Sequence, residues 1–300
     1  MIRNLSLSLI LLCYIPSAYS WGDMGHQTVA EIAERHLTPE AKRAINNILG
    51  PEKLGMAATW ADSIKDDPEF NNFKAFHFLD LKAKKDIRTI LNLYPALLQN
   101  PNEERSVKMI ALRYLVHVIG DIHQPLHAGM KNDRGGNQCV VDWDDKILNF
   151  HSVWDGKIIE YDILKLKIHY SPLSFYSYLT YSDDILKLLP LTESDKKDIQ
   201  GKTFEEWIKE SQSVEADVYP NPDTDSYCKN IPTNIPKISE SYKEKAVEIT
   251  RKRLLYGGLR LASFLNQIFI TGGTPGLNSD LSKEQILKKL DLNNTPRENE

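Results

Sequence analysis

Two histidine–aspartate pairs constrain this chain more than any other feature of its sequence. His117 and Asp121 are four residues apart, and so are His151 and Asp155. On an α-helix, a spacing of four residues places two side chains on one face. The spacing therefore predicts two helical segments, each of which presents an imidazole and a carboxylate from one side.

These residue types are typical of a zinc site. Imidazole nitrogen and carboxylate oxygen are the usual zinc ligands outside thiolate sites. A single His-x-x-x-Asp pair also occurs by chance on surface helices. Here the two pairs and His127 fall within 39 residues of a chain that has only eight histidines. The pattern therefore predicts a bound metal.

Residues 1–20 have the features of a secretory signal peptide. A positively charged start precedes an apolar core at residues 5–15, and Ala18 and Ser20 are small residues at the positions that signal peptidase reads. We expect cleavage between Ser20 and Trp21, with an uncleaved anchor as the alternative. The expected product is secreted or periplasmic and has no membrane span, because no other segment reaches the ~18 apolar residues that a span needs.

The composition of the mature chain is that of an ordinary globular protein. Apolar residues make up 41% and charged residues 26% of the sequence. A mature length of 280 residues is within the range of one large domain. Loss of Arg3 with the signal changes the formal net charge from −4 to −5, so the chain lacks the basic character of DNA-binding domains. Bound metal ions would supply positive charge locally.

Two cysteines, Cys139 and Cys228, remain after signal removal. In an exported protein such a pair predicts one disulfide, here closing a loop of about 90 residues. Metal ligation by these cysteines is the alternative, although no C-x-x-C partner accompanies either of them. We favour the disulfide.

Helical periodicity predicts one mostly α-helical domain over residues 21–277. Thr38 and Pro39 form an N-cap followed by proline at the first helical position, and Ser171-Pro172 repeats this start. Ser194 is a further predicted N-cap. The expected helices cover residues 28–37, 39–49, 106–122, 171–188, 194–216 and 239–271.

Three segments depart from the helical pattern. Short apolar runs at residues 138–143 and 147–150 flank Asp144-Asp145-Lys146 and predict one small β-hairpin. Residues 219–237 are polar and predict a long loop pinned by Cys228. Residues 278–300 predict a flexible C-terminal tail.

Further motifs accompany the histidine–aspartate pairs. They are W-G-D-M-G-H at 21–26, W-A-D at 60–62, F-H-F-L-D at 76–80, W-I-K-E-S at 207–211 and L-R-L-A-S-F-L-N at 259–266. In this order they resemble the zinc-dependent single-strand-specific nucleases of moulds, plants and bacteria, the S-one and P-one type, which are related to zinc-dependent phospholipase C. The resemblance extends from Trp21 to about Asn266. It implies a helical catalytic domain that holds three zinc ions per chain.

The resemblance also implies which residues hold each ion. The first zinc would be held by Asp62, His77, His117 and Asp121. The second would be held by His127, His151 and Asp155. The third would be held by the free α-amino group and carbonyl oxygen of Trp21, by His26, and by Asp121 acting as a bridge.

Substrate contacts follow from the same resemblance. Asp62, Lys65, Asp121 and Asn137 would form the catalytic centre, where Lys65 replaces an arginine that is common in the family and loses its bidentate geometry. Phe78 would stack on an unpaired base and Asp80 would bind its edge. Asp133 and Asn137 belong to a D-R-G-G-N loop that would lie beside the attacked phosphate.

The implied activity is hydrolysis of single-stranded DNA and RNA to 5′-phosphorylated products, with removal of phosphate from nucleotide 3′-monophosphates. A phospholipase C is the alternative enzyme, although that family has a glutamate where Asp155 stands and lacks the D-x-G-G-N loop. A non-catalytic zinc-binding protein is the alternative outside enzymes. His123 has no ligand counterpart in the family, so we expect it to be structural or to support the ligands.

The maturation hypothesis predicts that any residue left before Trp21 removes one zinc. An added residue turns the α-amino group into an amide, whose delocalised lone pair binds metal poorly. The measurement compares the zinc content and turnover of a chain that begins at Trp21 with those of a chain carrying one extra residue. Three zinc ions and equal turnover in both would show that the free terminus is not a ligand.

Overall fold

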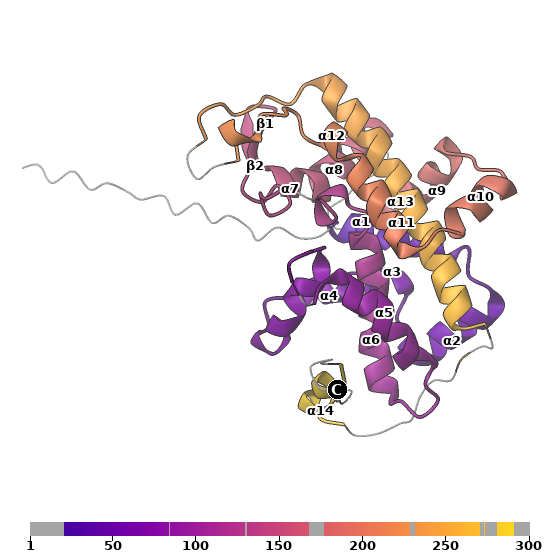
Figure 1. Cartoon of the computed structure of the whole chain (residues 1–300). Helices are drawn as coiled ribbons and strands as arrows, with labels where there is room; N and C mark the ends of the chain where they lie inside the picture. The colour runs from indigo at the N-terminus through magenta and orange to yellow at the C-terminus, as the bar shows by residue number, and fades with distance from the viewer. Residues whose placement is uncertain are drawn as a thin grey trace, which may run out of the picture.

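The computed structural model describes residues 21–83, 85–129, 131–167, 177–228, 232–270, 273 and 281–290. Helices dominate these ranges, and their sheet content is one two-stranded antiparallel hairpin. The predicted fold class, mostly α with one small hairpin, is therefore confirmed (Figure 1). The signal peptide expected at 1–20 and the helix start expected at Ser171-Pro172 lie outside the described residues.

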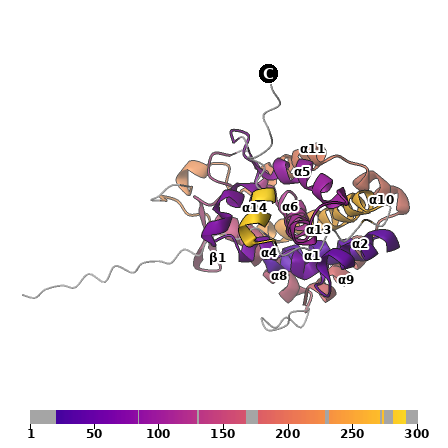
Figure 2. The same ribbon diagram turned by 90° about the horizontal axis from the view of Figure 1, so that it is seen from below.

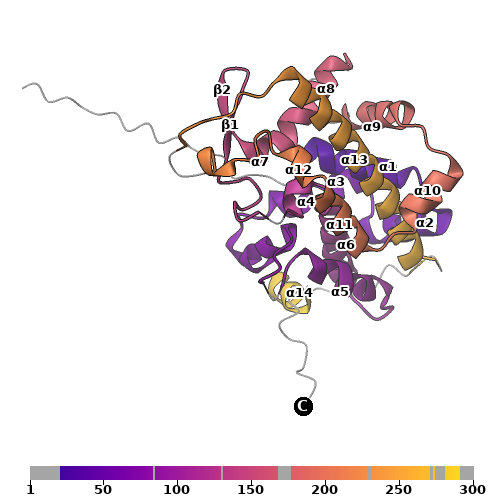
Figure 3. The same cartoon turned by 45° about the horizontal axis from the view of Figure 1, so that its top comes forward.

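Three helices form the centre of the molecule: α1 (Asp23–Glu34), α6 (Arg105–Asp121) and α13 (Glu240–Ile268). Each packs on the other two. The long helix α13 runs from the region of α8 (Ile158–Lys165) to that of α2 (Pro39–Leu49), as Figures 1 and 3 show. No helix in the described part of the chain has the length and apolar character needed to cross a membrane.

The remaining helical segments surround this centre. In chain order they are α3 (Leu54–Ala57), α4 (Trp60–Ser63), the 3₁₀ segment η1 (Pro68–His77), α5 (Ile87–Gln99), the 3₁₀ turn η2 (Pro125–His127), α7 (Phe150–Ser152), the π-helical turn η3 (Val153–Lys157), α9 (Ser177–Leu188), α10 (Glu193–Gln200), α11 (Phe204–Ser213), α12 (Glu215–Val218), the 3₁₀ turn η4 (Thr224–Ser226) and α14 (Lys283–Leu290).

Local capping explains where several helices begin. The Thr38 hydroxyl accepts a hydrogen bond from the Ala41 amide at 3.2 Å, and Pro39 opens α2 as predicted. The single helix predicted for residues 194–216 is wrong. Gly201 ends α10, and Thr203 starts α11 with a capping box, so the segment divides into α10, α11 and α12. The N-cap of α10 is Thr192 and not Ser194.

The hairpin belongs to a second, smaller hydrophobic cluster. Strand β1 (Val140–Trp143) pairs with β2 (Lys146–Asn149). The two turn residues, Asp144 and Asp145, have φ angles of 53° and 62°, the left-handed conformation of a tight hairpin turn. A disulfide between Cys139 and Cys228 ties this cluster to the loop that follows α12, which confirms the predicted pairing.

The chain beyond α13 contributes one more helix to the core. Leu290 of α14 is fully buried, and the Lys289 ammonium lies 2.7 Å from the Glu103 carboxylate. Helix α14 packs against α6, and the view from below in Figure 2 shows them together. Helix α14 lies within residues 278–300, for which the sequence predicts a flexible tail.

We predict that the disulfide contributes measurably to the free energy of unfolding. It joins residues 89 positions apart. Closing a loop of this length lowers the conformational entropy of the unfolded chain, which raises the free energy of unfolding by about 4 kcal/mol. Replacing both cysteines by serine should lower the free energy of unfolding by up to that amount, measured by chemical denaturation. Unchanged stability, with wild type equally insensitive to a reductant, would contradict this role.

Candidate metal centre

The C-terminal turn of α6 places His117 and Asp121 at the centre of the molecule. Both side chains are fully buried. The His117 Nε2 atom lies 3.2 Å from Asp121 Oδ2, so the two groups converge as the four-residue spacing predicts. Helix α6 is buried on nearly all of its faces, which explains how its last turn reaches the interior.

Two residues from other elements join this pair. Asp62 comes from α4 and His77 ends η1. His77 Nδ1 lies 2.9 Å from His117 Nε2, and the Asp62 carboxylate lies 3.7 Å from His77 and 3.8 Å from His117. Helix α4 and η1 each contact α6, so the packing brings four predicted ligands together.

The two oxygens of Asp121 face different groups. Oδ2 lies toward His117 and His77, at 3.2 and 3.4 Å. Oδ1 lies 3.3 Å from Nε2 of His26, which comes from α1. Neither oxygen accepts a hydrogen bond from the described residues. A buried carboxylate left in this state is costly unless cations satisfy it, and its two-sided geometry suits a bridge between metals.

A second group lies beside the first. His127, His151 and Asp155 come from η2, α7 and η3. The Nε2 atoms of the two histidines are 3.0 Å apart, and Asp155 Oδ2 lies 3.3 Å from His151 Nε2. The sequence predicts an α-helix through His151 and Asp155, whereas the structure has a π-helical turn over Asp155. Such turns are frequent at functional sites.

Carbonyl groups fix the orientation of three of these imidazoles. Because a carbonyl only accepts, the Nδ1 atoms of His117, His127 and His151 donate to the carbonyl oxygens of Ala58, His77 and Gly135. In the neutral rings of His127 and His151 the Nε2 lone pair then points into the centre. Lone pairs that face each other at 3.0 Å repel unless a cation or a proton lies between them. The donor set therefore fits metal ions.

The local electrostatics favour this reading. Burial lowers the pKa of His151 to about 3 and the pKa of His26 to about 4. Both rings are therefore neutral at pH 7, as metal ligation requires. Burial opposes charge on His117 as well, but the Asp121 and Asp62 carboxylates outweigh it and raise the pKa of His117 to about 9. A metal at this group would displace a proton.

Gln124 supports the second group and was not predicted from the sequence. Its side-chain amide donates to Asp155 Oδ1 at 2.8 Å, while its own carbonyl oxygen caps η2 by accepting from the Leu126 amide. A lone glutamine has no distinctive spacing. Its role appears only when the turn after α6 meets η3.

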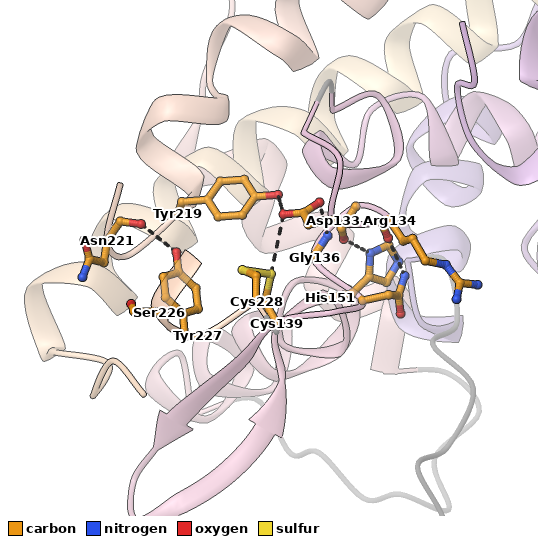
Figure 4. The surroundings of a disulfide bond; sticks show 12 residues. Asp133, Arg134, Gly136, Cys139, His151, Tyr219, Asn221, Ser226, Tyr227 and Cys228 are labelled. Carbon is orange, nitrogen blue, oxygen red and sulfur yellow. Dashed lines mark hydrogen bonds between the residues drawn. A yellow bond between two sulfur atoms is a disulfide. The ribbon is translucent and has the colours of Figure 1, made fainter. Parts of the chain in front are cut away.

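The D-R-G-G-N loop holds His151 in place. Gly135 has a φ of 62°, and a Cβ there would lie 2.5 Å from the Leu126 carbonyl oxygen, so only glycine fits. Asp133 is buried and does not line the cavity described below. Its carboxylate accepts hydrogen bonds from the Gly136 amide at 2.9 Å and from the Tyr219 hydroxyl at 2.6 Å (Figure 4). Asp133 therefore supports the loop from within, and its substrate contact stays a prediction.

A cavity of about 960 Å³ opens over both groups. Besides predicted metal ligands, its wall includes four residues that were predicted to act on the substrate: Lys65, Phe78, Asp80 and Asn137. Phe78 is 44% exposed, and the Lys65 ammonium lies 3.8 Å from Asp62 Oδ1. Although the whole chain is acidic, the cavity has five basic residues in its wall: Lys65, Lys74, Lys82, Lys131 and Arg134.

The first described residues lie against the second group. Trp21 is fully buried, and the Gly22 amide donates to the Asp155 carbonyl at 2.8 Å. This hydrogen bond fixes Gly22 at the turn η3, which carries the predicted ligand Asp155. Trp21, the predicted N-terminal ligand, directly precedes Gly22 in the chain. The two cysteines, in contrast, form a disulfide, which removes thiolates from the candidate ligands.

Comparison with known proteins agrees with this geometry. The sequence model of the S1/P1 Nuclease family matches residues 21–270. The chain belongs to the S1/P1 nuclease family. The matched residues include the three central helices and all nine residues predicted as metal ligands.

Named relatives agree with the family assignment. Endonuclease 3 of Arabidopsis thaliana is 30% identical over 290 residues, covering 87% of this chain and 93% of the relative. Nuclease S1 of Aspergillus oryzae is 29% identical over 301 residues, covering 89% and 98%. Nuclease P1 of Penicillium citrinum is 32% identical over 155 residues, covering 45% and 57%. The protein is thus a nuclease, and hence a hydrolase, of this family.

The packing of His26 yields a prediction within α6. A Cβ at Gly120 would lie 2.7 Å from His26 Nδ1, whereas a Cβ at Gly156 would meet nothing within 4 Å. Gly120→Ala should push His26 from Asp121 and reduce the bound zinc by one ion. Gly156→Ala should retain full zinc content. Metal analysis of both variants checks this, and equal zinc in the two would show that His26 is not a ligand.

Proposed function

We propose that this nuclease uses three zinc ions to hydrolyse phosphodiester bonds of single-stranded DNA and RNA, with 5′-phosphorylated products and 3′-nucleotidase activity. The observation that carries the proposal is the convergence of three ligand groups, two of which contribute residues to the wall of one cavity. His26 with Asp121, Asp62 with His77 and His117, and His127 with His151 and Asp155 each bring their ligand atoms close together.

The ions, when bound, would supply an activated water and positive charge for the leaving oxygen. The chain's own contribution is to hold the substrate above them. The Lys65 side chain is 12% exposed and extends along the cavity wall, where its ammonium would neutralise the attacked phosphate. Asn137, held by its amide donating to the Arg134 carbonyl at 3.0 Å, would orient the same phosphate.

Single-strand preference would come from the exposed ring of Phe78. An aromatic face stacks on any base, but only on one that has left its partner. Asp80 is two residues further along the same wall, and its carboxylate accepts a hydrogen bond from the Lys82 amide at 2.9 Å. In this position it would read the edge of the stacked base.

Export of the mature protein is part of the proposal. It is supported by the signal-peptide features of the sequence at 1–20 and by the Cys139–Cys228 disulfide, since disulfides persist in oxidising compartments. Cleavage before Trp21 would free the amine that the third ion requires.

The stacking role of Phe78 is tested with a matched neighbour. Leu81 is 60% exposed and lines the same cavity, but its side chain cannot stack on a base. We expect wild type and Leu81→Ala to cleave heat-denatured DNA faster than native duplex DNA. Phe78→Ala should lose about tenfold or more on the denatured substrate, because stacking contributes about 1–3 kcal/mol per base.

Initial rates on the two DNA forms provide the measurement. Equal rates for wild type on denatured and duplex DNA would contradict single-strand preference. An equal loss in Phe78→Ala and Leu81→Ala would contradict stacking while leaving the metal centre in place. Absence of turnover in zinc-loaded protein on any nucleic acid would favour the non-catalytic alternative.

A further inference from the structure

Two family-like stretches that contain no metal ligand meet behind the metal centre. Residues 207–211 lie on α11, and residues 259–266 lie on α13. Together with Arg253, also on α13, they enclose the turn that follows α6. The side chains of Arg253, Arg260 and Ser211 are almost completely buried. Buried arginines are expensive to keep in a protein, so their contacts require an explanation.

Arg253 binds several groups at once. Its Nε donates to the His123 carbonyl at 3.0 Å, and its Nη2 donates to the Ser211 hydroxyl. The Ser211 hydroxyl in turn donates to the Ile122 carbonyl at 2.6 Å. Nη1 of Arg253 lies 3.3 Å from Glu210 Oε2. One guanidinium therefore ties α11 to two consecutive carbonyls of the turn.

Arg260 fixes the side chain of the same turn. His123 Nδ1 donates to the Ile119 carbonyl at 2.7 Å, so its Nε2 is the acceptor for Arg260 Nη1 at 3.1 Å. The other end of the guanidinium lies 2.7 Å from Glu210 Oε2.

The carbonyl groups of Ile122 and His123 lie just beyond the C-terminal end of α6. Carbonyl groups at this end have no partner within the helix. Ser211 and Arg253 satisfy them, and a cation at this end also complements the helix dipole. The residues on either side, Asp121 and Gln124, face the metal centre, where Gln124 holds Asp155. The turn at residues 121–124 is thus held by hydrogen bonds on the side away from the metal centre.

We propose that Arg253, Arg260 and Ser211 are positioning residues that set the zinc affinity of this centre by fixing the turn at residues 121–124. None of the three is in a candidate ligand group, so they would act through the orientation of Asp121 and Gln124. The inference rests on the zinc centre proposed above. Groups that hydrogen-bond directly to metal ligands are typically worth about 10- to 100-fold in metal affinity, and we expect a comparable effect from residues that fix the turn carrying them.

A purely structural role would leave a different signature. Removing one partner of a buried ion pair destabilises the fold, whatever the distance between that pair and a binding site. Arg251 provides the matched control. It lies on the same helix, and its guanidinium binds the buried carboxylate of Asp162, with Nε 2.7 Å from Oδ2. Nothing in this pair contacts the turn at residues 121–124.

The experiment measures zinc affinity by competition with a fluorescent chelator, and thermal stability, for the mature protein and three variants. Arg253→Met should lower the affinity of at least one zinc by 10-fold or more. Arg253→Lys, which keeps the charge but loses the fork of donors, should fall between wild type and Arg253→Met. Arg251→Met should lose thermal stability while its zinc affinity stays within about twofold of wild type.

Two outcomes would overturn the inference. Zinc affinity in Arg253→Met equal to wild type would remove the positioning role, and so would an equal loss of affinity in Arg251→Met. A wild-type protein that binds no zinc would instead refute the proposed metal centre itself, so the two failures are distinguishable.

Discussion

The buried carboxylate of Asp121 is the interaction on which the rest of the structure depends. Its two oxygens point to different imidazole groups, and neither accepts a hydrogen bond from the described residues. Without a cation, burial of this group would be expensive. The fold places imidazoles from α1, α6 and η1 around it, with His26, His117 and His77 each within 3.4 Å of one of its oxygens. The same constraint explains why the end of α6 is held from behind by arginines.

Much of this site was predictable from the sequence, because metal ligation needs particular residue types at particular spacings. His117 with Asp121 and His151 with Asp155 occupy one centre as their four-residue spacing indicates. The start of α2 and the hairpin were also predictable, because short sequence segments determine them. Thr38-Pro39 determines the helix start, and two short apolar runs determine the hairpin. The family resemblance extended the ligand set beyond what spacing could reach.

What the sequence did not predict depends on contacts between distant segments. Gln124 has no pattern of its own, and its role exists only because η3 returns to the end of α6. The hydrogen bond from the Tyr219 hydroxyl to the Asp133 carboxylate joins residues 86 positions apart, so no local pattern indicates it. The division of residues 194–216 into three helices was missed because the periodic apolar pattern outweighed the local capping signal at Thr203. The arginine contacts likewise join α11 and α13 to one turn.

We propose that Asp121 bridges two zinc ions while His127, His151 and Asp155 hold a third. Anomalous diffraction at the zinc edge, from crystals of the mature protein that begins at Trp21, tests it most directly. We predict three zinc peaks per chain, two of them within about 2.0–2.2 Å of opposite oxygens of Asp121. A single peak, or three peaks of which only one contacts Asp121, would contradict it.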